Sequence, residues 1–404
     1  MTGTTWHIIT GEYPPQRGGV SDYTQQVAFG LTKRGCKVHV WSAGDEGDRL
    51  ETDEPNREVV EVHRVAGGFS ASDLRRLGRL LSGFPSPRTL LVQYVPNAFG
   101  MRGLNLLFCL WLLGRRLFAG DDIRVMFHEP FFYFGRQRLR RNLLAAMNRV
   151  MAVALLAASR VVYISIPAWE KMLRPYALLR DVEMVWLPIP STIPRVEDEE
   201  GVASVRGKYA PVEAGRLIVG HFGTYGDHIR PGLGEIFVEL FNRRSDAVGL
   251  FIGANGEEFL ASLTAAHPEF RGRLFAAGYL SKREASLHLQ ACDLAIQYYP
   301  DGASTRRTSL MAALLNGTAT ISSSGHLTEP FWRRDESVPL APAVDKAALV
   351  QLALRLLGDS SLRERTRLAG RELYLRELSL DQSIKILLRD MNRGCEPELL
   401  SSTF

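Results

Sequence analysis

Hydrophobic and polar positions divide the chain into short apolar runs and longer amphipathic segments that alternate with one another. Runs rich in β-branched and aromatic residues predict buried strands, and the segments between them have the period of helices. Strand–helix alternation is typical of parallel, doubly wound sheets. We therefore expect strands at residues 5–10, 37–42, 59–65, 89–95, 124–128, 160–164, 184–188, 217–222, 248–253, 274–278, 294–299 and 319–322, and helices at 22–34, 72–82, 138–158, 233–243, 281–291 and 308–316.

The alternation occurs in two blocks, which predicts two α/β domains. The stretch LPIPSTIPRVEDEEG, residues 187–201, is rich in proline and then acidic, and is the best linker candidate. The 404 residues also exceed the roughly 250–300 at which one core stays compact. We predict two Rossmann-like domains facing across a cleft, at 1–190 and 191–375. The segment 376–404 is expected to form a C-terminal helix that packs back on the first domain, followed by a tail.

Composition indicates a broad class of protein but no specific activity. With 46% hydrophobic and 23% charged residues the chain resembles a soluble globular enzyme, and a net charge of +5 is no nucleic-acid signature. The N-terminus lacks the pattern of a secretory signal, so a cytoplasmic protein is expected. No C-x-x-C pair is present, which predicts reduced thiols at the four cysteines, Cys36, Cys109, Cys292 and Cys395.

The stretch EYPPQRGGVSD, residues 12–22, lies between the first strand and the first helix. We expect the helix to begin at 22 with Ser21 or Asp22 as its N-cap. Glycines allow close backbone approach and helix N-termini attract phosphate, so Gly18 and Gly19 are candidate phosphate-binding residues. A tight strand-to-helix turn without a ligand is the alternative.

The segment from Glu12 to Ser42 resembles the opening of glycosyltransferase family 4, which shows E-Y-P-P, G-G-V, a helix and then R-G-H-x-V-x-V. The stretch YYPDGASTRRTSLMAALLNGTATISSSG, residues 298–325, resembles that family's proline-led loop and the helix and strand after it. The resemblance implies the GT-B arrangement, with an acceptor domain at 1–190 and a donor domain at 191–375. It also implies sugar transfer with retention of configuration, a nucleotide-sugar co-substrate, no further cofactor and no metal. A carbohydrate or lipid-linked acceptor is the expected partner, in polysaccharide or glycolipid biosynthesis.

The sequence departs from that family where two glutamates would contact the donor, because Ser304 and Ala312 stand there. The segment STRRTS places Arg306 and Arg307 at the loop that the resemblance assigns to the diphosphate. Guanidinium groups bind phosphate through forked donors. Either Thr305 or Thr308 could cap the helix that follows. We therefore predict donor binding by the segment 304–308, with a solvated helix start as the alternative.

A second candidate phosphate loop is VGHFGTYGDHIRPGLGEIF, residues 219–237, where family members carry G-R-L and K-G. Gly223 matches the pattern, Thr224 replaces the arginine, and Arg230 is the cation nearest to the lysine position. All three are predicted to bind the donor. The alternative for Arg230 is an exposed loop residue.

In the first block, His128 and Glu129 follow a predicted strand, where the family has a histidine near the reaction centre. We predict catalytic roles for both, and the alternatives are a structural histidine and a polar helix-entry residue. The loop QYVPNAFGMRG, residues 93–103, follows the preceding strand. Tyr94, Asn97 and Arg102 in it are predicted to line the acceptor side.

Arginines at 136, 138, 140 and 141 precede the apolar segment 142–158, and a basic face beside apolar residues suits an anionic membrane surface. A domain helix with a solvated basic start is the alternative. Three classes remain open from sequence: a sugar-nucleotide transferase, a non-catalytic GT-B protein that binds a sugar phosphate or serves as a partner subunit, and another enzyme of this architecture such as an epimerase or phosphorylase.

Overall fold

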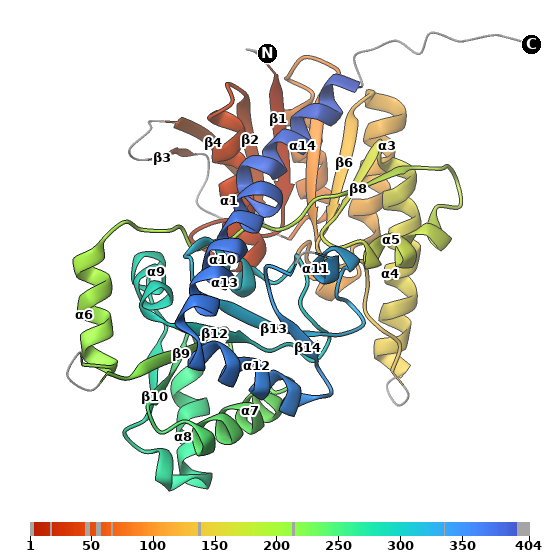
Figure 1. Cartoon of the computed structure of the whole chain (residues 1–404). Helices are drawn as coiled ribbons and strands as arrows, with labels where there is room; N and C mark the ends of the chain where they lie inside the picture. Colours follow the sequence, from red (N-terminus) through yellow and green to blue (C-terminus); the bar gives the residue numbers. More distant parts are fainter. Residues whose placement is uncertain are drawn as a thin grey trace, which may run out of the picture. The chain divides into compact units, whose positions relative to one another are not determined.

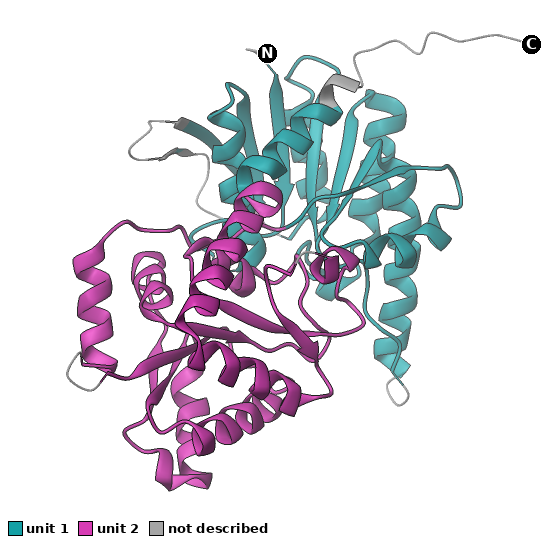
Figure 2. Ribbon diagram, in the orientation of Figure 1, with its two compact units in different colours: residues 1–188, 380–404 teal, residues 189–379 magenta. Residues whose placement is uncertain are grey.

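The computed structural model describes residues 4–16, 18–44, 49–53, 58–65, 68–135, 139–211, 215–334 and 336–393. The chain divides into two compact units (Figure 2), unit 1 with residues 1–188 and 380–404, and unit 2 with residues 189–379. Each unit is built around its own mostly parallel sheet, which confirms the predicted fold class of two Rossmann-like α/β domains.

Unit 1 contains an eight-stranded sheet in the order β3-β4-β2-β1-β5-β6-β7-β8 (Figure 1). All neighbouring strands are parallel except β3, which runs antiparallel to β4 at the edge. The strands are β1 (Thr5–Thr10), β2 (Lys37–Ala43), β3 (Arg49–Asp53), β4 (Glu58–Val65), β5 (Thr89–Tyr94), β6 (Asp122–Phe127), β7 (Val161–Ile164) and β8 (Glu183–Trp186).

The helices of unit 1 lie in the connections between these strands, except the last one, which comes from the end of the chain. They are α1 (Gly19–Thr32), α2 (Ala71–Leu81), α3 (Leu106–Ala119), α4 (Leu139–Ala158), α5 (Ala168–Leu173) and, from the end of the chain, α14 (Leu380–Arg393), with short 3₁₀ turns η1 (Met101–Gly103) and η2 (Arg174–Tyr176).

The last helix, α14, packs against α1 although some 350 residues separate the two in sequence. A Cβ on Gly30 would lie 2.8 Å from Ile384 Cγ1, so the absence of a side chain at position 30 lets the helices approach closely. An ion pair between Arg34 and Asp381 holds the start of α14 to the end of α1. The chain therefore begins and ends its described part in unit 1.

Unit 2 contains a six-stranded parallel sheet in the order β11-β10-β9-β12-β13-β14. Its strands are β9 (Leu217–Phe222), β10 (Ala247–Ile252), β11 (Leu274–Gly278), β12 (Leu294–Gln297), β13 (Thr320–Ser324) and β14 (Leu340–Pro342). Its helices are α6 (Glu199–Tyr209), α7 (Arg230–Arg243), α8 (Gly256–Ala266), α9 (Lys282–Ala291), α10 (Thr308–Leu315), α11 (Pro330–Arg334), α12 (Lys346–Gly358) and α13 (Ser360–Leu373), with turns η4 (Pro268–Phe270) and η5 (Tyr374–Leu378).

Strand β10 shows why the strands of unit 2 have continuous apolar sequences. Val248, Leu250 and Ile252 belong to the core on one face of the sheet. Ala247 and Phe251 belong to the core on the other face. Because successive side chains point to opposite faces, a strand covered on both sides must be apolar throughout.

Candidate functional site

The loop from β1 to α1 brings Gly18 and Gly19 to the carboxyl end of a central strand of unit 1. The Ser21 amide donates to Glu12 Oε1 at 3.2 Å. A Cβ on Gly18 would lie 2.5 Å from the same oxygen, whereas a Cβ on Gly19 would meet nothing within 4 Å. A carboxylate of the chain itself therefore occupies part of the predicted phosphate position, and the open space lies beside Gly19. Phosphate binding by these glycines stays a prediction.

The start of α1 differs from the expected one. The helix begins at Gly19, with Gly18 as an N-cap that provides no side-chain hydrogen bond. Ser21 is fully buried and its hydroxyl donates to the Gln16 carbonyl at 2.6 Å. The predicted N-cap at Ser21 or Asp22 is wrong because Glu12 supplies the acceptor from nine residues earlier, a contact that local sequence does not reveal.

His128 directly follows β6 and lies at the carboxyl end of that strand. Its Nε2 is 2.8 Å from Gln93 Oε1, and the Tyr23 ring meets it edge-on with centroids 5.0 Å apart. Burial lowers the pKa of His128 to about 3, so the imidazole is neutral at physiological pH. With the Gln93 amide oriented as the structure has it, Nε2 carries the proton and Nδ1 is a hydrogen-bond acceptor. Glu129, the next residue, is exposed.

Of the residues predicted for the acceptor side, Tyr94 ends β5, and Asn97 and Arg102 follow it in the loop. The backbone of this loop packs so tightly on the loop after β1 that a Cβ on Gly11 would lie 1.9 Å from the Ala98 carbonyl oxygen. Asn97 and Arg102 are exposed, and Arg102 has a left-handed backbone with φ of 53°. Tyr94 is fully buried among aromatic rings. The prediction that Tyr94 contacts the acceptor is therefore wrong, because this side chain belongs to the core. Acceptor contact by Asn97 and Arg102 stays a prediction.

In unit 2, Gly223 and Thr224 follow β9, and Arg230 is the first residue of α7. Arg230 donates through Nε to the Tyr225 carbonyl at 2.6 Å and through both terminal nitrogens to Glu258 at 2.9 Å. Each nitrogen of this guanidinium thus has a partner within the unit. Phosphate binding by Arg230 would require exchange of Glu258, and it stays a prediction, as do the roles of Gly223 and Thr224.

The segment between β12 and α10 places Arg306 and Arg307 on one carboxylate. Arg306 pairs with Asp301 Oδ2 at 2.6 Å, Arg307 pairs with Asp301 Oδ1, and the Arg307 guanidinium lies 4.6 Å from the Tyr299 ring centroid. Burial alone would raise the pKa of Asp301, but Arg307 and Arg306 hold this pKa below its ordinary value. Asp301 thus accepts from both arginines, in the loop that precedes α10 (Figure 1).

The N-cap residue of α10, the helix that follows this loop, provides no side-chain cap. Its N-cap is Arg307, which gives no side-chain hydrogen bond, and Thr308 is its first residue. The predicted cap at Thr305 or Thr308 is therefore wrong. Thr305 instead donates from its amide and hydroxyl to Glu329 Oε1, at 2.8 and 2.6 Å. An uncapped helix start next to two arginines favours an anion.

Ser304 and Glu329 complete this region. The Ser304 hydroxyl is buried and has no hydrogen-bond partner among the described residues. Glu329 is buried, accepts from Trp332 Nε1 at 2.8 Å in addition to Thr305, and burial raises its pKa. Sequence reasoning missed Glu329 because it is 24 residues from Thr305. It also missed Asp301, although the P-D-G turn five residues before Arg306 was a usable signal.

Known proteins resemble this chain in structure but not in sequence. No family model matches the chain, and no curated protein sequence matches it. Sucrose-phosphate synthase from Thermosynechococcus elongatus superposes with a TM-score of 0.66 at 16% identity, covering 97% of this chain and 98% of that one. Anabaena HepE in complex with UDP and glucose gives 0.67 at 11% identity, covering 96% and 100%.

A third similar structure is the α,α-trehalose 6-phosphate synthase of Burkholderia multivorans, with a TM-score of 0.67 at 11% identity, covering 98% of this chain and 97% of that one. The agreement extends over both units in every case. The chain therefore has the GT-B fold, the class of two Rossmann-like domains to which these synthases belong.

Proposed function

We propose that this chain is a retaining glycosyltransferase, resembling family 4, that moves a sugar from a nucleotide-sugar donor to an acceptor hydroxyl. The observation that carries the proposal is the loop of Arg306 and Arg307, which share Asp301 at the uncapped start of α10. This loop follows a strand of a doubly wound sheet, where such sheets bind ligands. The GT-B fold supports the class of reaction but not its substrate.

The proposed chemistry breaks the bond between the anomeric carbon of the sugar and the diphosphate oxygen. The diphosphate leaves with the bonding electron pair and takes up the proton of the acceptor hydroxyl, whose oxygen bonds to the same face of the sugar. Arg306, Arg307 and the amides at the start of α10 would stabilise the charge that develops on the leaving group. Without a glutamate at 304 or 312, donor-sugar and ribose recognition must use other residues.

Replacing both arginines, R306A/R307A, is expected to weaken nucleoside diphosphate binding by at least about 100-fold, since each of the two charge-assisted hydrogen bonds lost contributes about 1.5–3 kcal/mol. Calorimetric titration with UDP, ADP and GDP measures the affinity. The matched control is R333A/R334A, an adjacent pair of exposed arginines in the same unit. Equal affinity of the two double variants would remove the phosphate role of Arg306 and Arg307. A panel of nucleotide sugars, scored for nucleoside diphosphate release with and without acceptor, then tests transfer.

His128→Ala is expected to lower turnover at least about tenfold while donor affinity changes little, because a neutral imidazole would hydrogen-bond the reacting sugar. Since the pKa of His128 is about 3, this residue should give no limb in the pH–rate profile between pH 5 and pH 9. Glu129→Gln, measured in parallel, reports on the second proposed catalytic residue. An unchanged turnover in H128A would return the histidine to a structural role.

One observation favours a non-catalytic GT-B protein as the second candidate: each guanidinium nitrogen of Arg230 already donates to Tyr225 or Glu258. A protein of that kind would bind a sugar phosphate or nucleotide but release no nucleoside diphosphate. The nucleotide-sugar panel separates the two candidates, because both bind and only the transferase turns over.

We further propose that unit 1 attaches to anionic lipid at the cytoplasmic membrane surface, where a lipid-linked acceptor would reside. Stripes of exposed apolar residues run along α3 (Leu107, Leu110, Leu117 and Phe118) and the neighbouring α4 (Leu139, Leu143 and Val150). Arg140 and Arg141 are exposed at the start of α4, whereas Arg136 and Arg138 lie outside the described residues. Helix α4 is long and apolar enough to span a bilayer, but half of it is buried within the protein, as in a core helix.

L139E/L143E is expected to reduce flotation with vesicles that contain anionic lipid at low salt, because charge on the apolar stripe opposes insertion. L368E/L375E, which alters two exposed leucines of unit 2, is the matched control. If wild-type protein does not float with these vesicles, lipid attachment through α3 and α4 is wrong.

A further inference from the structure

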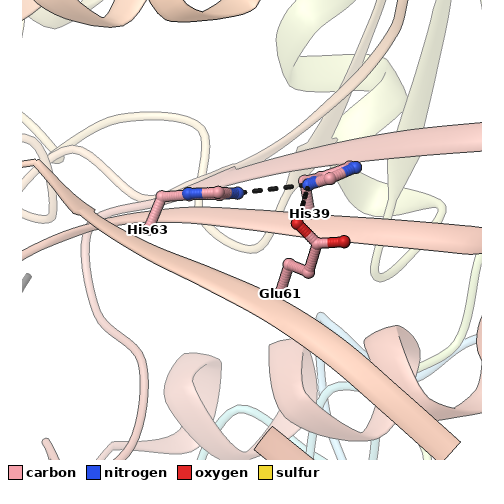
Figure 3. A group of neighbouring side chains, drawn as sticks. All are labelled: His39, Glu61 and His63. Carbon is pink, nitrogen blue, oxygen red and sulfur yellow. Dashed lines mark hydrogen bonds and ion pairs between the residues drawn. The ribbon is translucent and has the colours of Figure 1, made fainter. Parts of the chain in front are cut away.

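Two histidines and a glutamate meet on the sheet of unit 1 in a cluster that the proposed transferase does not use. His39 lies on β2, and Glu61 and His63 lie on the neighbouring β4 (Figure 3). His39 Nδ1 is 3.1 Å from His63 Nε2 and 3.2 Å from Glu61 Oε2. One ligand atom from each residue therefore points to a common centre, within 4.8 Å of the other two.

The strand register explains why these side chains converge. Strands β2 and β4 are parallel, with His39 opposite Glu61 and Trp41 opposite His63. Alternate residues of a strand share one face of the sheet, so Glu61 and His63 both point to the side on which His39 lies. The Trp41 ring stacks on the His63 ring with centroids 4.1 Å apart, which holds that imidazole in place.

Hydrogen bonding can account for only one of the two contacts of His39 Nδ1 at a time. A neutral imidazole carries one N–H, and His39 Nδ1 faces two partners. If Nδ1 donates to Glu61, it has no second proton for His63. If it accepts from His63, its lone pair is shared while the carboxylate oxygen receives nothing from it. A cation at the common centre would be bonded by all three atoms at once.

The two contacts of His39 also match the spacing of ligand atoms in tetrahedral coordination. Zinc binds imidazole nitrogen at about 2.0–2.1 Å and carboxylate oxygen at about 2.0–2.2 Å, which places neighbouring ligand atoms of a tetrahedron roughly 3.3 Å apart. The two contacts of His39, 3.1 and 3.2 Å, have that length. Two imidazoles and one carboxylate form a ligand set that suits Zn²⁺ and the neighbouring first-row ions.

We propose that His39, Glu61 and His63 form a binding site for a divalent transition-metal ion, with Zn²⁺ as the expected occupant and water as its fourth ligand. Glu61 is half exposed, so an ion can enter from solvent. Strand β4 has the central sheet on one side and only the antiparallel β3 on the other. An ion joining β2 to β4 would therefore fix the edge of the sheet.

This site is separate from the proposed donor chemistry. His39 pairs with His7 of β1, which lies three residues before the end of that strand. The cluster is therefore about 10 Å from the carboxyl end of the sheet, where the donor residues are predicted. The inference does not depend on the proposed function, and the two can fail independently.

The test uses the full chain produced without a histidine tag and stripped of metal with a chelator. Titration with Zn²⁺ against a competing indicator should give one equivalent bound with a dissociation constant below about 1 μM. Saturation at a hundredfold excess over that constant should raise the melting temperature by about 5–10 °C, since the ion binds the folded state. Co²⁺ bound in the same site should show the visible absorption of tetrahedral coordination.

H63Q removes one ligand and should weaken Zn²⁺ binding at least about 100-fold. Loss of a group that only supports a ligand already weakens metal binding by about 10- to 100-fold, and loss of a ligand should cost more. E61Q changes an exposed side chain and keeps the proposal testable if H63Q fails to fold. His267 and Glu269 form a surface pair in unit 2 with a similar separation, 3.2 Å, and no third ligand joins them among the described residues, so H267Q is the matched control. Binding with a dissociation constant below about 1 μM that is lost in H63Q and in E61Q but kept in H267Q supports the site. Binding that is weaker than this, or equal in all variants, overturns it.

Discussion

Lowering the pH from 7 to 5 is expected to reduce the free energy of unfolding by about 4 kcal/mol in unit 1 and about 2 kcal/mol in unit 2, out of the roughly 5–15 kcal/mol that stabilises a domain. Three histidines with lowered pKa values cause this loss, His7 and His128 in unit 1 and His221 in unit 2. Burial lowers the pKa of His7, His128 and His221 to about 3, and for His7 the neighbouring His39 and His63 lower it further.

The direction follows from which state binds protons. A histidine in the unfolded chain has a pKa of about 6.5 and is protonated at pH 5, whereas these three stay neutral in the folded protein. The unfolded state therefore gains protons as the pH falls, and each histidine costs about 2 kcal/mol by pH 5. The loss begins near pH 6.5 and continues towards pH 3. The pKa values of Glu329 and Asp390, which burial raises, act in the opposite direction.

Urea unfolding followed by circular dichroism at pH 7 and pH 5 measures this loss. His221→Leu is the informative variant, because both ring nitrogens of His221 are buried without a hydrogen-bond partner among the described residues. The leucine should remove about 2 kcal/mol of the pH-dependent loss. If the wild-type transition occurs at the same urea concentration at both pH values, the three histidines are not held neutral.

Most of the fold could be predicted from sequence because buried parallel strands have a strong local signal. The expected strand at 5–10 matches β1, and the expected strand at 217–222 matches β9. Strand β3 was missed because Arg49–Asp53 is polar, as an antiparallel edge strand can be. Helix α6 was not predicted because its acidic start, which Asp198 caps, also fits the acidic end of the predicted linker.

The candidate sites were less predictable because their geometry depends on partners distant in sequence. His128 directly follows β6, as its place after a predicted strand indicated, but the sequence did not indicate that Gln93 would pair with His128 or Asp301 with Arg306. Glu258 was not foreseen as the partner of Arg230. Only a weak signal in the sequence indicated the proposed metal site of His39, Glu61 and His63. Glu61 and His63 alternate on one strand, but the third ligand lies on another strand.

Glu329→Ala is expected to destabilise unit 2 by about 3–5 kcal/mol, because three buried donors lose their acceptor. The Thr305 amide and hydroxyl and the Trp332 indole N–H all donate to this carboxylate, at 2.6 to 2.8 Å. Thr305 precedes the two arginines of the candidate donor loop. The same substitution should therefore also weaken nucleoside diphosphate binding, in the part of the protein that remains folded.

Glu329→Gln separates the role of shape from that of the second oxygen. Its amide oxygen can still accept from Thr305, but its amide nitrogen faces the Trp332 N–H as a second donor, so a smaller loss of about 1–3 kcal/mol is expected. Glu336→Ala, an exposed glutamate nearby, is the matched control. Urea unfolding monitored by tryptophan fluorescence ranks the three variants. If E329A is as stable as E336A, Glu329 does not support the loop, and the positions of Arg306 and Arg307 must be fixed mainly by their shared contact with Asp301.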